Sequence, residues 1–215
     1  NQKVIGFSCD ISDNISINTV LKEIWDHFKK IDVLINLAAI DAKFDKNINN
    51  ISNLTFENFP LDQWNKSIDV NLTGTFNVTQ ATIKKMLLQG YGNIISVAST
   101  YSLVSPNQNL YKFDNSNNNL FKPIDYVVTK SIIPNFSRYI ATYYGKKKIR
   151  ANTIVLHGIV DKPVKGFSEN FSKLSPIGRL CKVEEIRGPF VFLASDASSY
   201  MTGSLLVVDG GWTSW

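Results

Sequence analysis

The sequence predicts an α/β protein built on a doubly wound parallel sheet. Short apolar runs alternate along the chain with longer segments whose apolar residues recur every three or four positions. Asp32–Ala39 and Asn93–Ala98 are continuous apolar runs, as expected for strands that a parallel sheet buries on both faces. Alternation of this kind is typical of a sheet covered by helices on both sides.

The first predicted elements are a strand over Lys3–Cys9 and a helix behind the cap candidates Ser12–Asn14. Apolar positions from Val20 to Phe28 fall on one face of that helix. Ala42–Pro60 is polar, rich in asparagine and without periodicity, so we expect a loop there.

The second half of the chain continues the alternation. Trp64 to Ile83 marks a long helix with Gly90 just past its end, and a second long loop follows later. Pro134 falls inside a predicted helix, where the missing amide donor should kink the helix or loosen a turn. The remaining predicted elements are the loop Thr100–Pro123, the helix Tyr126–Tyr144, the strand Arg150–Val155, the helix Val183–Ala194 and the strand Leu205–Val208.

The composition indicates a single domain, residues 1–215, in a reducing compartment. A chain of 215 residues is long enough to bury a substantial core. Its 2 cysteines, Cys9 and Cys181, lie far apart, so we expect neither a disulfide framework nor a metal cluster. His27 and His157 also lack partners at the spacing of metal ligands, and no metal is predicted.

Charge and hydropathy favour neither nucleic acid nor a membrane as partner. The net charge of +5 is spread along the chain, and Lys146–Lys148 fits cations that complement the C-terminal end of a helix. No apolar run approaches the roughly 20 residues that span a bilayer. The opening residues, NQKVIG, lack the layout of a signal peptide, so we expect a cytoplasmic protein.

Tyr126 and Lys130 are the residues most indicative of chemistry. They stand four positions apart and so share one helical face, just downstream of Ser99, which closes the run GNIISVAS. A tyrosine has a pKa of about 10, and a neighbouring cation lowers it towards the range useful for proton transfer. Tyr143 and Lys147 have the same spacing but lie around Gly145, where a helix should end, and are expected on the surface.

This context resembles the short-chain dehydrogenase/reductase family from Val4 to the C-terminus. The matching segments come in the family's order, which implies a Rossmann-like sheet and a dehydrogenase or reductase activity with NAD or NADP as cofactor. They are CDIS at Cys9–Ser12, LINLAA at Leu34–Ala39, WNKSIDVNLTGTF at Trp64–Phe76, Ser99, YVVTK at Tyr126–Lys130 and SDASSYMTGSLLVVDGGW at Ser195–Trp212.

The resemblance implies four catalytic residues. Tyr126 would exchange a proton with the substrate oxygen, which Ser99 would hydrogen-bond. Lys130 would lower the pKa of Tyr126 and hold the ribose hydroxyls of the cofactor. Asn71 would bind a water through a gap in its helix and so link Lys130 to solvent. Simpler alternatives remain open: Ser99 could merely cap a strand, and Asn71 could be an ordinary surface residue.

The resemblance also places the cofactor along the ends of the strands, with departures from the family's pattern. The second asparagine and the glycine of the family's LVNNAG are Leu37 and Ala39 here, and Leu156 and His157 replace a Pro-Gly pair before Gly158. Asp10, expected near adenine, could equally be a turn residue. The implied cofactor-binding residues are Asp10, Ile11, Asn36, Leu37, Ala38, Ala39, Val97, Tyr126, Lys130, Leu156, Gly158 and Ile159.

A narrower resemblance concerns the substrate. The segment SPNQNLY and the pair KP before Tyr126 are similar to bacterial family members linked to surface-sugar and flagellin modification. This implies a small polar substrate, such as a sugar or nucleotide-sugar, and the family's habit implies a homo-oligomer, either a dimer or a tetramer. We expect Thr100–Pro123 and Pro163–Leu174 to flank one cleft and set substrate choice. Phe167, Phe171, Lys165 and Lys173 would form a lid over an anionic sugar.

The family's glycine-rich loop, TGxxxGxG, does not occur in this sequence, nor does the second strand that follows it. The family's sheet has the order 3-2-1-4-5-6-7, so we expect a sheet lacking its first two strands. Asp32–Ala39 would be an edge strand, paired directly with Lys3–Cys9, and the chain alone would bind NAD or NADP weakly. A catalytically silent homologue that serves as a binding or oligomer-partner scaffold, or a purely structural subunit, is the alternative.

Overall fold

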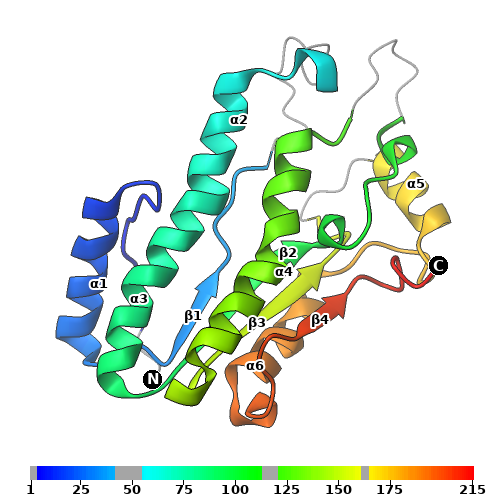
Figure 1. The fold of residues 1–215 in the computed structure, drawn as a ribbon. Helices are drawn as coiled ribbons and strands as arrows, with labels where there is room; N and C mark the ends of the chain where they lie inside the picture. Colours follow the sequence, from blue (N-terminus) through cyan, green and yellow to red (C-terminus); the bar gives the residue numbers. More distant parts are fainter. Residues whose placement is uncertain (1–3, 42–54, 113–120, 161–164) are drawn as a thin grey trace.

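The structure, a computed structural model, describes residues 4–41, 55–112, 121–160 and 165–215. Its centre is a parallel sheet of four strands in the order β1-β2-β3-β4 (Figure 1). The strands are β1 (Val33–Asn36), β2 (Gly92–Ser99), β3 (Ile149–Leu156) and β4 (Leu205–Val208). The predicted doubly wound class is confirmed, and the predicted strands lie where expected except at the N-terminus.

Helices cover both faces of this sheet. α3 and α4 pack on one face, around Ile94 and Ala151, whereas α6 packs on the other, around Ile95 and Ile154. In Figure 1, α1, α3 and α4 lie side by side in front of the strands. The helices are α1 (Asn14–Phe28), α2 (Leu61–Ser67), α3 (Thr75–Gln89), α4 (Ile124–Tyr144), α5 (Lys165–Leu174) and α6 (Arg187–Ala194).

Short helical turns connect these elements. A π-helical segment, Ile68–Gly74, joins α2 to α3, so the long helix expected from Trp64 to Ile83 is continuous but changes its hydrogen-bond pattern in the middle. Gly90 ends α3 in the left-handed conformation at φ 84°, as predicted. The 3₁₀ turns are Phe56–Asn58, Thr100–Ser102, Gln108–Tyr111, Gly145–Lys147, Val183–Ile186 and Asp196–Ser198.

Local sequence explains where the helices begin. Asp13 caps α1 by accepting hydrogen bonds from the amides of Ile15 and Ser16, within the predicted cap region. Pro123 stands at the cap position of α4, and its fixed φ favours the turn into the helix. Pro134 lies buried inside α4, which runs through it as one helix of 21 residues.

The predicted strand Lys3–Cys9 is wrong over its described part. Val4–Cys9 forms no strand, and β1 pairs with β2 alone, so the expected direct pairing is wrong as well. α1 packs chiefly against α3, and the N-terminal segment lies beside α1 (Figure 1). A strand must come within about 4.8 Å of its neighbour to form ladder hydrogen bonds, and the path along α1 keeps this segment from doing so.

The expected edge at β1 is confirmed. Among the described residues β1 has a partner on one side only, and it is shorter than the predicted Asp32–Ala39. Ile35 is 43% exposed and Leu37 is 60% exposed, an unusual state for apolar residues at a parallel strand. The exposure of these two apolar residues follows from the pairing of β1 with β2 on one side only.

No helix in the described ranges is both long and apolar enough to cross a membrane. Those ranges also hold no group of three His, Cys, Asp or Glu side chains that could share a metal ion. His27 is exposed on α1, whereas His157 is buried just after β3.

Candidate active site

The parallel sheet brings its chemistry-bearing residues to one edge. Ser99 ends β2 level with Leu156 at the end of β3, and both strands run in the same direction. Tyr126 lies in the first turn of α4, and Lys130 follows one turn later on the same helix. The predicted Ser99, Tyr126 and Lys130 therefore meet at the carboxyl ends of the strands, where open α/β sheets bind their ligands.

Lys130 is held by the sheet. Its side chain crosses to β2 and donates from Nζ to the Val97 carbonyl oxygen at 2.9 Å. The residue is 7% exposed, and burial lowers the pKa of its ammonium to about 8. The negative charge of Asp41 raises the pKa of Lys130, and the positive charge of Lys122 lowers it. Both effects are weaker than that of burial.

The pKa of Tyr126 contradicts the expected effect of Lys130. Burial raises the pKa of this phenol, and the charge of Asp41 and the neighbouring Tyr101 raise it further, whereas a hydrogen bond with Ser99 lowers it. Lys130 Nζ lies 5.9 Å from the centroid of the Tyr126 ring and is directed to Val97. The structure thus keeps the phenol protonated, because desolvation outweighs the cation.

Asn71 is a structural link between three elements. It lies buried in the π-helical segment, where its side-chain amide exchanges hydrogen bonds with the backbone of Ile40, at 2.6 Å and 2.9 Å, and donates to Thr129 Oγ1 at 3.1 Å. The backbone carbonyl oxygen of Asn71 accepts a hydrogen bond from Thr75 Oγ1 at 2.8 Å. The ordinary-surface alternative for Asn71 is excluded, since 3% of the residue is exposed. A π-helical turn of this kind often marks a functional site.

Ser99 caps the turn that follows β2, and its role towards the substrate stays a prediction. Its hydroxyl oxygen accepts from the Tyr101 amide at 3.3 Å. The same hydroxyl lies near enough to Tyr126 to lower the pKa of the phenol. The hydroxyl is therefore placed beside the phenol, where a substrate oxygen could bind to both.

The residues after β1 offer mostly backbone to a cofactor. Leu37, Ala38 and Ala39 are exposed just past the carboxyl end of the strand. The Asn36 side chain is used elsewhere, because it donates to Thr79 Oγ1 at 2.9 Å and to Ser96 Oγ at 3.2 Å. An extended dinucleotide at this edge would fit the exposed peptide groups.

Asp10 and Ile11 form the turn before α1. Asp10 Oδ1 accepts from the Ser12 amide and hydroxyl, and these bonds lower the pKa of its carboxyl. Ile11 packs against Gly74, whose Cα has no room for a side chain, since a Cβ would lie 2.9 Å from Ile11 Cγ1. The turn is thus fixed against the π-helical segment that carries Asn71.

His157 is the largest departure at the end of β3. Its Nδ1 shares a 2.6 Å hydrogen bond with Thr100 Oγ1, and its ring lies 4.5 Å from that of Trp212. Burial lowers its pKa to about 4, so the imidazole is neutral. Gly158 follows at φ 66°, and a Cβ there would meet Phe171 Cζ at 2.3 Å.

The two predicted specificity segments lie together. Asn170 of α5 donates to the carbonyl oxygens of Asn109 and Lys112, and Tyr101 lies 6.4 Å from Tyr126 between ring centroids. The two segments contact each other within the described residues, and the cleft between them and its part in substrate choice stay predictions. Phe171 is 2% exposed and belongs to the core, so its predicted role in a lid is wrong. Phe167 packs against Tyr111, and the Lys165 side chain lies outside the described part.

Sequence reasoning missed the pair Lys122–Asp41. Lys122 precedes the cap of α4, and its Nζ lies over the Tyr126 ring, 3.8 Å from the centroid, in an ion pair with Asp41. The sequence shows only a lysine beside the positive end of a helix, where cations are disfavoured, and nothing in it points to Asp41 as the partner.

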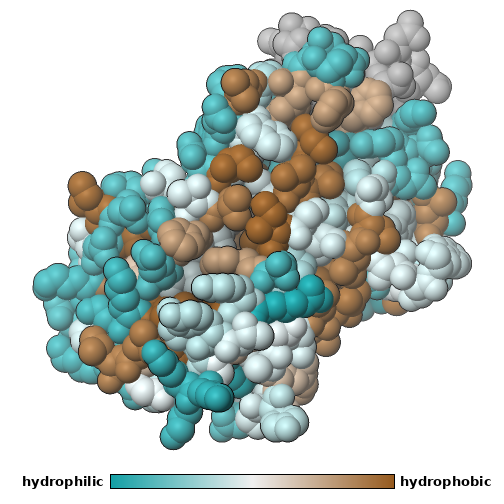
Figure 2. Space-filling model, in the orientation of Figure 1, coloured by the Kyte–Doolittle hydropathy of each residue, from teal (hydrophilic) through white to brown (hydrophobic). Residues whose placement is uncertain are grey.

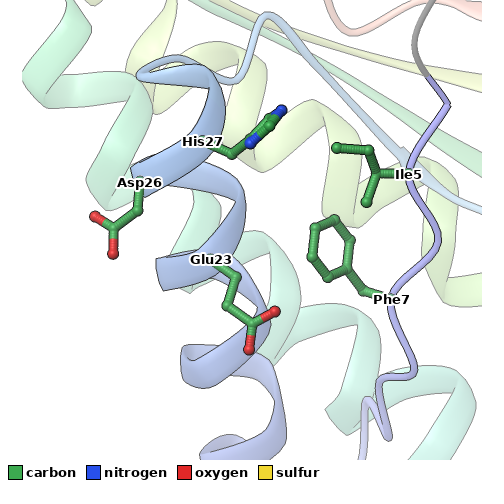
Figure 3. A pocket seen from close by; sticks show the side chains of 5 residues that line it. All are labelled: Ile5, Phe7, Glu23, Asp26 and His27. Carbon is green, nitrogen blue, oxygen red and sulfur yellow. The ribbon is translucent and has the colours of Figure 1, made fainter.

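Two hollows lie away from Tyr126. One separates the N-terminal segment from α1, where His27 faces Ile5 and Phe7 above Glu23 (Figure 3). The other lies between the turn at Asp10 and the helix that carries Asp69. Neither hollow is lined by Ser99, Tyr126 or Lys130, so the candidate chemistry stays at the edge of the sheet.

A parallel sheet with a serine, a tyrosine and a lysine at its carboxyl edge defines a nucleotide-dependent dehydrogenase or reductase class of fold. Residues 1–213 match the family model described as Enoyl-(Acyl carrier protein) reductase, which represents short-chain dehydrogenases and reductases. The chain belongs to the short-chain dehydrogenase/reductase family.

Similar proteins share the full extent of this chain. A D-threitol dehydrogenase of Mycolicibacterium smegmatis is 31% identical over 213 residues, covering 97% of this chain and 73% of that protein. Post-translational flagellin modification protein A of Campylobacter coli is 28% identical, covering 98% and 78%. The crystal structure of a short-chain dehydrogenase from Leptospira borgpetersenii with bound NAD⁺ superposes with a TM-score of 0.83 at 29% identity, covering 96% and 74%.

Proposed function

We propose that this protein transfers a hydride between NAD or NADP and a carbonyl or alcohol group of a small, sugar-like molecule. Bound nicotinamide would supply the hydride, and the residues of this chain would position the substrate and move the proton. The meeting of Ser99, Tyr126 and Lys130 at the carboxyl edge is the observation that supports the proposal most strongly. The relatives that act on polyols, or take part in flagellin modification, support the class of substrate.

Each residue has a role that its surroundings support. Tyr126 stays protonated because of burial, so it begins as a proton donor to a carbonyl oxygen, and the reverse reaction returns the proton. Ser99 hydrogen-bonds the same oxygen. Lys130, whose pKa is about 8, faces the edge as a cation that can hold ribose hydroxyls and stabilise the phenolate when the proton leaves. Asn71 holds the segment after β1 against α4 and so fixes the floor of the site.

Tyr126→Phe tests this proposal. The variant keeps the ring and removes the hydroxyl, so we expect a loss of turnover of about 10²- to 10⁴-fold, with little change in NAD or NADP affinity. Tyr143→Phe is the matched control, because Tyr143 has the same spacing to Lys147 but is 60% exposed. For each variant of the intact protein, initial rates measure turnover and a dinucleotide titration measures the affinity for NAD or NADP. A Tyr126→Phe variant that keeps most of its rate would show that the assignment is wrong.

A catalytically silent scaffold is the second candidate function. It is favoured by His157, which places a buried aromatic side chain where the family has a glycine. A protein that binds dinucleotide but turns over no polyol, sugar or sugar acid would support this candidate over the enzyme.

We also propose that the protein forms a homo-oligomer. Figure 2 shows apolar side chains gathered along the middle of the face on which α3 and α4 lie. Phe76 and Leu88 on α3 are 46% and 77% exposed, and Ile132 on α4 is 37% exposed. Burying such a face against a second copy is favourable at roughly 25 cal/mol per Å² of apolar area.

A further inference from the structure

The positive charge of the Lys122 ammonium lies in surroundings that disfavour a positive charge. Its side chain is 10% exposed, and burial lowers its pKa. It stands directly before Pro123, the cap of α4, so the positive end of that helix disfavours a second positive charge nearby. A lysine in such a position requires a negative partner.

The backbone of Lys122 is fixed in place. Gln108 accepts from its amide at 2.9 Å through Oε1 and donates to its carbonyl oxygen at 3.4 Å through Nε2. Pro123 restrains the next residue. The ammonium is thereby held over the Tyr126 ring, 3.8 Å from the centroid.

The negative groups around Lys122 differ in how firmly they are held. Asp125 is buried beside Tyr126, and its carboxylate accepts a hydrogen bond from Ser67, so it belongs to the protein interior. Asp41 forms the ion pair with Lys122 and is 37% exposed, just beyond the end of β1. Asp41 is therefore the partner that another anion could displace without opening the core.

We propose that Lys122 binds a negatively charged group of the substrate, a carboxylate or a phosphate a few bonds from the reacting carbon, in exchange for Asp41. This rests on the proposed oxidoreductase function, because the substrate oxygen must bind Tyr126. An ammonium over the Tyr126 ring reaches a group attached near that oxygen and no farther. The preferred substrates are then sugar acids or sugar phosphates rather than neutral polyols.

The test compares three ligands with one carbon skeleton: D-gluconate, D-glucitol 6-phosphate and neutral D-glucitol. Binding to the intact protein saturated with NAD⁺ or NADP⁺ is measured by calorimetry, and oxidation is measured by initial rates. We expect at least one charged ligand to bind about tenfold or more tightly than D-glucitol. The charged ligand that binds more tightly distinguishes a carboxylate site from a phosphate site.

Lys122→Met should weaken the binding of the preferred charged ligand by about 10- to 100-fold and leave the binding of D-glucitol unchanged. Lys146→Met is the control, since Lys146 is an exposed lysine in the turn just after the opposite end of α4. Asp41→Asn should tighten the charged ligand, because the competing carboxylate is lost, and this variant tests the exchange even if Lys122→Met fails to fold.

The outcomes separate the inference from the proposed function. Three results would overturn the role of Lys122. The protein could bind all three ligands with equal affinity, it could bind neither charged ligand, or the Asp41→Asn variant could bind the charged ligands more weakly than wild type. Oxidation of D-glucitol without a preference for charge overturns the inference and leaves the oxidoreductase standing. Binding of a charged ligand through Lys122 without turnover supports the inference and counts against the oxidoreductase.

Discussion

The ammonium of Lys130 and the phenol of Tyr126 share one poorly solvated environment, and burial moves their pKa values in opposite directions. It lowers the pKa of Lys130 and raises that of Tyr126, so each is driven towards its neutral form. From the spacing of the two residues alone, only their mutual charge effect could be predicted. The larger influence of burial depends on the packing of α4 against β2 and the turn after it, which the chain brings together from distant positions.

Lys130 should make the stability of the fold depend on pH. Its pKa falls from 10.5 in the unfolded chain to about 8 in the fold, so between these values the unfolded chain binds more protons. The free energy of unfolding should therefore rise with pH across this window, by up to about 3 kcal/mol. Below pH 8 the full penalty of burying the charge is present.

Lys130→Met removes this titration and should flatten the rise. Urea unfolding at pH 7.5, 8.5 and 9.5 compares the two proteins, and the difference between them cancels the other titrating groups. Exposed Lys22, paired with Asp26 on α1, provides the control variant Lys22→Met. The same slope in wild type and Lys130→Met would mean that Lys130 is hydrated rather than buried.

At the scale of elements, the end of β3 is fixed by packing against α5. Gly158 needs a positive φ, and the space where its side chain would lie is filled by Phe171. Phe171 in turn stacks on Trp212, at 5.0 Å between ring centroids, and packs beside His157. α5 is thus anchored to the C-terminal segment through Phe171.

Gly158→Ala should destabilise the fold because alanine disfavours the positive φ and its Cβ would clash with Phe171. Together the two effects should cost about 2–4 kcal/mol. Gly203→Ala is matched in backbone conformation, at φ 72°, but its Cβ would lie 3.5 Å from the nearest atom. It should cost only about 1 kcal/mol. Urea unfolding measures both, and adding Phe171→Leu to Gly158→Ala should recover part of the loss. Equal costs at the two glycines would contradict the packing argument.

The sequence predicted the elements that repeat a simple pattern and missed those that depend on partners. The runs at Asn93–Ala98 and Leu205–Val208 became strands because each pairs with β3. Val4–Cys9, the described part of the predicted first strand, has a similar apolar composition but pairs with no described strand, so composition alone could not decide its conformation. Ser99 and Tyr126 could be placed from their elements, whereas the contact of Lys122 with Asp41 joins residues 81 positions apart and leaves no local pattern.

At the scale of the whole molecule, the apolar face of α3 and α4 is expected to hold copies of the chain together. Leu88→Glu would place a carboxylate in that face and cost several kcal/mol on association, because a charge would be buried without a partner. We therefore expect a shift from dimer or tetramer towards smaller species in light scattering. Leu61→Glu is the control, since Leu61 is 71% exposed at the start of α2 and should leave the mass unchanged. The same oligomer in Leu88→Glu as in wild type would place the contact elsewhere. If the variant dissociates, its turnover shows whether the edge of the sheet functions within one copy.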